Sequence, residues 1–364
     1  MEAPDRGKVV VAMSGGVDSS VAAWLLQEQG YEVVGLFMRT GIESASAAGP
    51  GHRQGCCSAA DAADARTIAA RLGISLYMLN FKEQFEALIQ HFADEYARGR
   101  TPNPCILCNE RFKFGRLAQY AEAIGAHYVA TGHHARIVRC GERAVLACGC
   151  DADKDQSYAL FSVRRSMLDR MLLPVGELTK QEVRRHARQL DLPVHDKPDS
   201  QEICFVPDDD YARVVRQRRP DAFRPGAIRH VDGRDLGRHE GLAHYTIGQR
   251  RGLRIALGAP VYVTRLDAET NTVVLGPREA LLHDGLTAAG VNWLLDPPEG
   301  KLAVHAKIRY AHTAAGATLE PIGSERIRLI FEKPQSAITP GQAVVFYVDD
   351  VVLGGGWIDG WFDS

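Results

Sequence analysis

The stretch VVVAMSGGVDSS, residues 9–20, constrains the fold more than any other part of the chain. Its apolar start predicts a buried strand over residues 8–13, and helical spacing follows from about Ser19 to Gln29. Gly15 and Gly16 between them permit positive φ and close approach of the backbone. A strand, a glycine-rich turn and a helix in this order aim the helix N-terminus at an anion. The stretch therefore predicts a phosphate-binding loop within an α/β domain.

The polar residues of this loop narrow its chemistry. Ser14, Ser19 and Ser20 can add hydroxyl donors, whereas Asp18 would repel phosphate unless it holds Mg²⁺ or caps the helix. The pattern Gly-x₄-Gly-Lys-[Ser/Thr] is absent from the chain, so a P-loop that transfers a γ-phosphate is excluded. The alternative interpretation is an ordinary glycine-rich turn between a strand and a helix.

Strand and helix patterns alternate over the first 135 residues. We expect further strands at 31–38, 74–79 and 128–131, and further helices at 59–72, 85–98 and 112–124. This alternation predicts a doubly wound parallel sheet with helices on both faces. Because ligands of such sheets sit at the carboxyl ends of the strands, the loops at 14–20, 38–40 and 131–134 should converge.

The pattern changes along the rest of the chain. Residues 155–190 are expected to be helical with turns, and short β-like pieces follow from about 208, among them 244–247. From 286 onward only strands are expected, at 287–295, 302–310, 326–331, 343–348 and 351–358, with a hairpin turn at Asp349-Asp350. We predict three domains: a catalytic α/β domain at 1–207, a small mixed connecting domain at 208–277 and a β-barrel-like domain at 278–364.

Composition limits the class of protein. The 364 residues are 45% hydrophobic and 24% charged, as expected of a globular protein. The apolar runs are only as long as strands and the N-terminus has no signal-peptide pattern, so we expect a cytoplasmic protein without a membrane span. The net charge is −2, yet residues 208–254 hold eleven arginines against seven acids. This basic middle suits contact with phosphates, although a solvated helix face would look the same.

A second dense stretch, GRTPNPCILCNERFKFG at 99–115, carries two cysteines followed by Arg111 and Lys113. Three interpretations compete for Cys105 and Cys108. Zinc needs a second Cys-x₂-Cys, which the chain lacks, and inert core cysteines are common. The third is sulfur chemistry, because nearby cations turn a thiol into a thiolate nucleophile and one cysteine can carry a persulfide that another resolves.

The loop SGGVDS resembles the pyrophosphate-binding motif of the N-type ATP pyrophosphatases, the PP-loop superfamily of the adenine-nucleotide α-hydrolase-like fold. Further motifs follow in the order found in tRNA-specific 2-thiouridylases, the MnmA family. They are TPNPCILCN, RFKFG, TGHHAR (131–136), KDQSYAL (154–160), DSQEICFV (199–206), KIRY (307–310) and PGQ (340–342). The chain therefore resembles this family over nearly its whole length.

The resemblance implies an ATP-dependent 2-thiolation of the wobble uridine, position 34, of tRNAs for Glu, Gln and Lys. ATP with Mg²⁺ would adenylate the C2 oxygen, and sulfur would then replace AMP. By this resemblance Cys204 carries the persulfide, and Cys108 is the nucleophile that ends in a transient disulfide with Cys204.

The resemblance also implies binding residues. The ATP site would comprise Ala12, Met13, Ser14, Gly15, Gly16, Val17, Asp18, Ser19, Met38 and Gly132. The target base would meet Asn103, Pro104 and Cys105. The anticodon stem-loop of the tRNA would meet His133, Lys154, Asp155, Gln156, Arg309, Tyr310 and Gln342.

One residue departs from part of the family, in which Asp stands at the position of Cys105. Cys105, Cys108 and Cys204 could together hold three irons of a [4Fe–4S] cluster, as in related tRNA-thiolating enzymes. More distant alternatives are a PP-loop C–N ligase, which would not need Cys204, and an RNA-binding module with a relic nucleotide site. We expect a monomer served by a cysteine desulfurase or a sulfur-relay protein, and we leave Cys56 and Cys57 unassigned.

Overall fold

The computed structural model describes residues 6–41, 58–199, 203–206 and 210–363. The chain forms two compact units. The first comprises residues 1–88, 105–209 and 350–352, and the second comprises 89–104, 210–349 and 353–364. We describe each unit separately.

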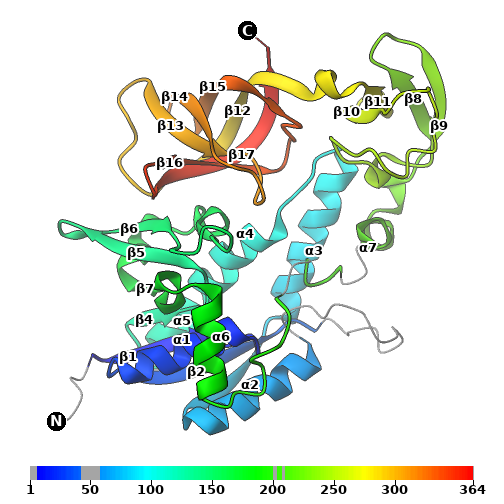
Figure 1. Cartoon of the computed structure of the whole chain (residues 1–364). Coiled ribbons are helices and arrows are strands. Elements are labelled where there is room, and N and C mark those ends of the chain that lie inside the picture. The colour runs from blue at the N-terminus through cyan, green and yellow to red at the C-terminus, as the bar shows by residue number, and fades with distance from the viewer. Residues whose placement is uncertain (1–5, 42–57, 200–202, 207–209, 364) are drawn as a thin grey trace. The chain divides into compact units, whose positions relative to one another are not determined.

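A parallel five-stranded sheet forms the centre of the first unit, in the order β3-β2-β1-β4-β7 (Figure 1). The strands are β1 (Lys8–Ala12), β2 (Glu32–Arg39), β3 (Ser75–Asn80), β4 (Tyr128–Ala130) and β7 (Met171–Leu172). Val9, Val10 and Val11 are all fully buried, so both faces of the central strand are covered. The predicted doubly wound α/β fold is confirmed.

Helices α1 (Val17–Glu28), α2 (Ala59–Leu72) and α6 (Lys180–Gln189) share one hydrophobic core with the sheet. Two of them begin with capping boxes, in which Ser58 pairs with Asp61 and Thr179 pairs with Glu182. These caps fix where each helix starts. Among the described residues, no helix is long and apolar enough to cross a membrane.

The region after the second cysteine differs from the expected helix at 112–124. Helix α4 (Pro104–Cys108) leads directly into a π-helix, η1 (Asn109–Arg116), before α5 (Leu117–Ala123). Gly115 permits the wider turn, since an added Cβ would lie 2.8 Å from the Glu110 carbonyl oxygen. π-Helices are rare and often mark functional sites.

The expected helical segment at 155–190, and the residues before it, also hold other structure. A hairpin of β5 (Ala135–Cys140) and β6 (Arg143–Cys148) precedes three short 3₁₀ helices, η2 (Ser157–Leu160), η3 (Arg165–Arg170) and η4 (Pro174–Glu177). Only α6 is an α-helix within the predicted helical segment 155–190. Pro174 and Gly176 explain part of this result because neither suits a helix interior.

The second unit holds a small four-stranded sheet and a barrel. Helix α7 (Tyr211–Arg218) precedes the small sheet, whose order is β10-β11-β8-β9. Its strands are β8 (Gly226–His230), β9 (Asp235–His239), β10 (Tyr262–Asp267) and β11 (Thr272–Gly276). The strand expected at 244–247 is absent: the short 3₁₀ helix η6 (Leu242–His244) and irregular backbone take its place, between Gly241 and Gly248 with positive φ.

The C-terminal strands form a closed antiparallel barrel, as predicted (Figure 1). The order β12-β15-β14-β13-β16-β17 closes through pairing of β12 with β17. The strands are β12 (Leu282–Trp293), β13 (Leu302–Lys307), β14 (Ala315–Ile322), β15 (Arg326–Ser336), β16 (Ala343–Val348) and β17 (Val351–Phe362). The predicted turn at Asp349-Asp350 joins β16 to β17, with Asp349 at φ 53°.

Candidate functional site

The loop between β1 and α1 is shaped for close packing. Gly15 has φ 70°, and an added Cβ would overlap the carbonyl group of Asp61. Gly16 is the N-cap of α1 and makes no side-chain capping bond; its carbonyl oxygen accepts hydrogen bonds from the hydroxyls of Ser19 at 3.2 Å and Ser20 at 2.7 Å. Helix α1 begins at Val17, two residues before the predicted start, so its first N–H groups face the loop.

Two of the three loops predicted to converge meet directly. His134 Nε2 lies 3.2 Å from Asp18 Oδ1, and a Cβ on Gly132 would lie 2.5 Å from the backbone of Ser19. The third loop follows β2, which pairs with β1 in parallel and so ends at the same edge of the sheet. There the Thr40 hydroxyl is buried without a hydrogen-bond partner among the described residues, and Met38 is buried.

Asp18 pairs with a lysine from α6, a helix far along the chain. Lys180 Nζ lies 2.7 Å from both carboxylate oxygens of Asp18. Burial raises the pKa of Asp18, but the His134 hydrogen bond and the Lys180 charge together bring that pKa below its ordinary value. Of the two roles considered for Asp18, capping of the helix is not observed, because Gly16 is the N-cap and makes no side-chain capping bond.

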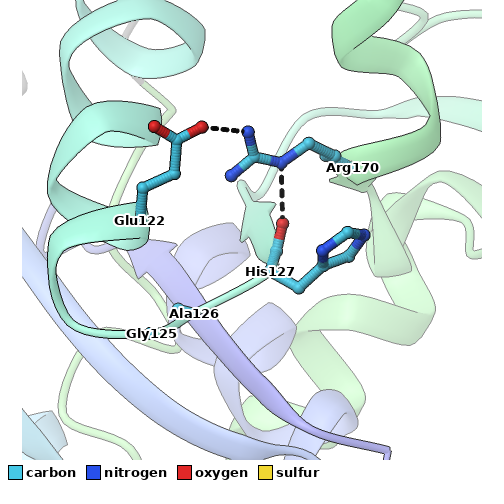
Figure 2. A pocket seen from close by; sticks show the side chains of 5 residues that line it. All are labelled: Glu122, Gly125, Ala126, His127 and Arg170. Atoms are coloured by element: carbon cyan, nitrogen blue, oxygen red, sulfur yellow. Dashed lines mark hydrogen bonds and ion pairs between the residues drawn. The ribbon is translucent and has the colours of Figure 1, made fainter.

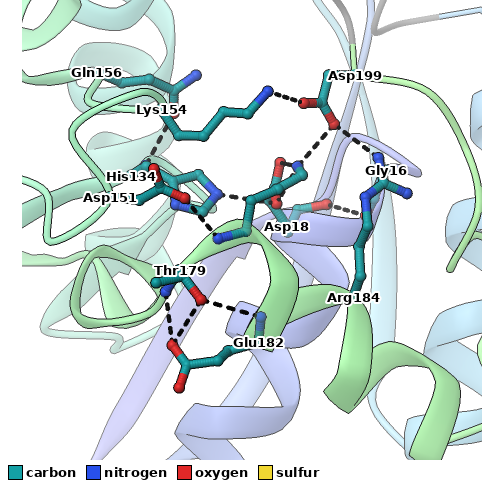
Figure 3. Close-up of polar contacts among 12 residues, drawn as sticks. Gly16, Asp18, His134, Asp151, Lys154, Gln156, Thr179, Glu182, Arg184 and Asp199 are labelled. Carbon is teal, nitrogen blue, oxygen red and sulfur yellow. Dashed lines mark hydrogen bonds and ion pairs between the residues drawn. The ribbon is translucent and has the colours of Figure 1, made fainter.

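Asp199 pairs with three cationic side chains, of which Figure 3 labels Lys154 and Arg184. Its carboxylate lies 2.8 Å from Lys154, 2.9 Å from Lys180 and 3.0 Å from Arg184. Burial raises the pKa of Asp199, but the hydrogen bonds from Lys154 and Lys180 outweigh it and lower this pKa to about 2. Lys180 therefore bridges Asp18, next to the glycine loop, and Asp199, five residues before Cys204.

Lys197 supports the loop from the other side. Its Nζ donates to the carbonyl oxygen of Gly15 at 2.9 Å and lies 2.7 Å from Asp61 and 2.6 Å from Asp64. Burial lowers the pKa of Lys197, yet the two carboxylates raise it above its ordinary value. The lysine thus stays charged and ties the loop to α2.

The residues of the KDQ motif all have partners within the first unit. Besides the Lys154–Asp199 pair, Asp155 accepts hydrogen bonds from the backbone N–H groups of Gly149 and Ser157. Gln156 Oε1 accepts from the backbone N–H of His134 at 2.9 Å. Of these predicted tRNA contacts, the structure therefore places Gln156 directly beside the loop at 131–134.

The two cysteine segments share an aromatic cluster. Phe85 lies 5.7 Å from Phe112 of the π-helix and 6.2 Å from Phe205, as measured between ring centroids. Phe112 follows Cys108 by four residues, and Phe205 follows Cys204 directly. Cys108 and Cys204 are both partly buried, whereas Cys105 is exposed. The cluster thus brings the backbone around both predicted reactive thiols to one side of the unit.

His133 is buried rather than presented at the surface. Its Nδ1 lies 2.7 Å from the Thr131 hydroxyl and its Nε2 lies 3.5 Å from Lys113 Nζ. Burial lowers the pKa of His133 well below its ordinary value, and the Lys113 charge adds to this, so the ring is neutral. Lys113, one of the two cations expected to act on the thiols, thus lies close to His133.

The remaining predicted tRNA contacts lie in the second unit. Arg309 donates to the carbonyl oxygen of Ser336 at 3.1 Å, and Tyr310 is 45% exposed. Gln342 donates to the carbonyl oxygen of Thr101 at 3.0 Å. Arg309, Gln342 and Thr101 line one cavity of about 420 Å³.

Three family models match successive parts of the chain. A family model described as the tRNA methyl transferase HUP domain matches residues 7–208. Models described as the tRNA methyl transferase PRC-barrel domain and the aminomethyltransferase β-barrel domain match 213–277 and 283–358. The tRNA-specific 2-thiouridylase MnmA of Carboxydothermus hydrogenoformans is 49% identical over 99% of both chains. That of Clostridium perfringens is 48% identical over 97% of this chain and 99% of its own.

The chain belongs to the tRNA-specific 2-thiouridylase family. Members of this family are tRNA sulfurtransferases of the PP-loop superfamily. A solved U34-tRNA thiolase from Methanococcus maripaludis, described with its [4Fe–4S] cluster, is 20% identical over 59% of this chain and 65% of its own, with a TM-score of 0.36. That likeness is too weak to inform the site of this thiouridylase-family chain.

Four charged residues of the candidate site were not predicted from the sequence: Lys180, Arg184, Lys197 and Asp199. The signal for Asp199 was its place at the head of DSQEICFV. The signal for Lys180 was its place directly after the capping residue Thr179, at the start of a helix. The pairing of each with the glycine loop required the fold.

Metal binding by the cysteines gains no support from the geometry. In the parts of the chain that the structure describes, no three His, Cys, Asp or Glu side chains are grouped as a metal would require. Cys105, Cys108 and Cys204 are all within that part. Cys56 and Cys57 lie outside the described residues.

A second cavity, of about 370 Å³, lies where α5 ends and β4 begins (Figure 2). Arg170 lines this cavity, where it pairs with Glu122 and donates a hydrogen bond to the His127 carbonyl oxygen at 2.9 Å. This is the amino edge of the sheet, opposite to the edge that carries the glycine loop. We therefore assign it no part in the reaction.

Proposed function

We propose that the protein converts the wobble uridine, position 34, of tRNAs for Glu, Gln and Lys into 2-thiouridine, with ATP cleaved to AMP and pyrophosphate. The observation that carries this proposal is the bridge made by Lys180. One ammonium group joins Asp18, at the glycine loop, to Asp199, at the head of the segment that contains Cys204. The residues proposed for nucleotide chemistry and the cysteines proposed for sulfur transfer thus belong to one unit.

The first step activates a poor leaving group. The C2 oxygen of uridine attacks the α-phosphorus of ATP, the bond to the β-phosphate breaks, and pyrophosphate leaves. ATP would lie along Ala12–Ser19, Met38 and Gly132. Ala12, Met13 and Val17 are buried, so their contribution would come from the backbone. Mg²⁺ would neutralise the phosphates and would be held chiefly by phosphate oxygens and water, because both Asp18 oxygens are paired with Lys180.

The second step transfers sulfur. The terminal sulfur of a Cys204 persulfide attacks C2 and AMP leaves. The Cys108 thiolate then attacks the inner sulfur, which releases 2-thiouridine and forms a Cys108–Cys204 disulfide. A cellular reductant restores both thiols. A cysteine desulfurase or a sulfur-relay protein would supply the persulfide sulfur.

The three domains would divide the work. Residues 1–207 would perform catalysis, 208–277 would connect, and 278–364 would hold the tRNA through Arg309, Tyr310 and Gln342. Asn103, Pro104 and Cys105 would contact the target base, which must leave its stack. His133, Lys154, Asp155 and Gln156 would complete the contacts with the anticodon stem-loop. We propose that the protein acts as a monomer in the cytoplasm.

Two cysteine variants test the sulfur route. Cys204→Ser should abolish 2-thiouridine formation while the protein still binds ATP, and Cys108→Ser should do the same. Cys140→Ser, which changes an exposed cysteine on β5, serves as the matched control and should retain full activity. A Cys204→Ser protein with normal thiolation would overturn the persulfide route.

The same experiment also tests the two alternatives, the iron–sulfur cluster route and the C–N ligase. Thiolation that occurs only in iron-loaded protein would support a [4Fe–4S] cluster on Cys105, Cys108 and Cys204. ATP cleavage to AMP with no sulfur in the tRNA, unaffected by Cys204→Ser, would support a C–N ligase.

A further inference from the structure

A lysine from α6 lies next to the glycine loop, which has no lysine of its own. The loop lacks the lysine that binds phosphate in P-loop enzymes. Lys180 is the first residue of α6, and the Thr179–Glu182 capping box fixes the start of that helix. Its side chain is 10% exposed, and its Nζ lies in the first turn of α1, against Asp18.

We propose that Lys180 is a catalytic residue that contacts the β- and γ-phosphates of ATP and stabilises the charge on the departing pyrophosphate. This inference rests on the function proposed above. The uridine oxygen bonds to the α-phosphorus, the bond from that phosphorus to the bridging oxygen breaks, and its electron pair leaves on pyrophosphate. An ammonium group held at that oxygen would lower the barrier for this step.

The ion pairs leave Lys180 able to change partners. Its three N–H donors are now directed to two oxygens of Asp18 and one of Asp199. When a phosphate takes one of these donors, Asp199 keeps Lys154 and Arg184, and Asp18 keeps His134. Neither carboxylate is left as an isolated charge, which would be costly in so enclosed a place.

Two buried polar atoms point independently to a ligand at this edge. Among the described residues, Thr40 Oγ1 and His134 Nδ1 have no hydrogen-bond partner. Thr40 and His134 are only 2% and 3% exposed, and both follow strands whose carboxyl ends meet the glycine loop. Buried polar groups are rarely left unsatisfied, so these two atoms fit a site that a bound molecule completes.

The test uses Lys180→Gln in the full chain, with Arg188→Gln as the control. Arg188 lies on the same helix and pairs with Asp196, and its side chain is 58% exposed. Pyrophosphate with Mg²⁺ is the probe, and its dissociation constant is measured by calorimetry. We expect Lys180→Gln to weaken this binding about tenfold and to slow AMP formation on tRNA about 100-fold. Affinity for tRNA without nucleotide should stay within twofold, and Arg188→Gln should match the wild type.

A second variant guards against loss of folding. Asp18→Asn combined with Lys180→Gln removes both charges of the pair and should restore the melting temperature while pyrophosphate binding stays weak. Wild-type pyrophosphate affinity in either folded variant would overturn the assignment. If the wild type makes no 2-thiouridine yet loses pyrophosphate binding on Lys180→Gln, the assignment stands and the proposed function fails.

Discussion

At the scale of single residues, Asp199 is a carboxylate held by several cationic side chains of the candidate site. Lys154, Lys180 and Arg184 all contact its carboxylate. Gly15, Gly16 and Asp18 could be assigned to the loop from the sequence because they are neighbours in one motif. The partners of Asp199 could not, since they come from separate segments that only the fold brings together.

Asp199→Asn should make the stability of the protein less dependent on pH in acid. The pKa of Asp199 is lowered from 3.8 to about 2 in the folded state, so its charge stabilises the fold above pH 4 and this contribution is lost as pH falls toward 2. We expect the variant to lose about 2 kcal/mol of unfolding free energy at pH 7. Denaturant unfolding from pH 7 to pH 2 measures this difference, which should shrink below pH 4.

Asp169→Asn is the control for this pH series. Asp169 pairs with Arg139 at 3.1 Å, but both side chains are more than half exposed, so the expected change is small. Equal losses in the two variants, or a loss in Asp199→Asn that does not depend on pH, would contradict the account.

At the scale of elements, the π-helix after Cys108 is the feature least visible in the sequence. Apolar spacing at 112–124 predicted a helix but not its wider first turns. Asn109 anchors the element by donating to the Ala159 carbonyl oxygen at 2.9 Å, and Phe112 packs on Phe85. An added Cβ on Gly115 would lie 2.8 Å from the Glu110 carbonyl oxygen, a close approach within the π-helix that residue patterning does not reveal.

Gly115→Ala should disturb the thiol site and spare the nucleotide loop. The added Cβ would lie 2.8 Å from the Glu110 carbonyl oxygen, so the π-helix must rearrange. We expect a lower melting temperature and at least a tenfold loss of 2-thiouridine formation, with the affinity for ATP within twofold of the wild type. Gly300→Ala, where an added Cβ meets nothing within 4 Å, should change neither. Unchanged thiolation in Gly115→Ala would show that the π-helix is dispensable.

At the scale of the whole molecule, sequence patterns predicted the classes of structure better than the individual strands. The parallel sheet and the barrel were both predicted, because buried apolar strands and closely spaced turns are strong signals. Strand β14 was missed, since its sequence AGATLEPI is poor in the β-branched residues that mark strands. Within the second unit, the barrel holds the backbone just before Asn103: Thr101 N–H donates to Pro340 and Gln342 donates to Thr101.

Gln342→Ala should therefore affect tRNA more than ATP. Loss of the hydrogen bond to Thr101 frees the backbone that leads to Asn103 and Pro104. We therefore expect the KM for tRNA to rise fivefold to tenfold and the KM for ATP to stay unchanged. Steady-state kinetics with each substrate varied in turn measures both. The exposed Glu299→Gln is the control. An effect on ATP alone would contradict a role for the barrel in holding the tRNA.

The most direct test of the central claim is the product itself. The protein is purified without oxygen, freed of iron, and incubated with unmodified tRNA for Glu, Mg-ATP, a thiol reductant, and a cysteine desulfurase with cysteine, which supplies sulfur at the oxidation level of a persulfide. Nuclease digestion and mass spectrometry then locate sulfur in the tRNA. We predict 2-thiouridine at position 34, with one AMP formed for each sulfur inserted. ATP cleavage without sulfur at position 34, in both iron-free and iron-loaded protein, would contradict the account.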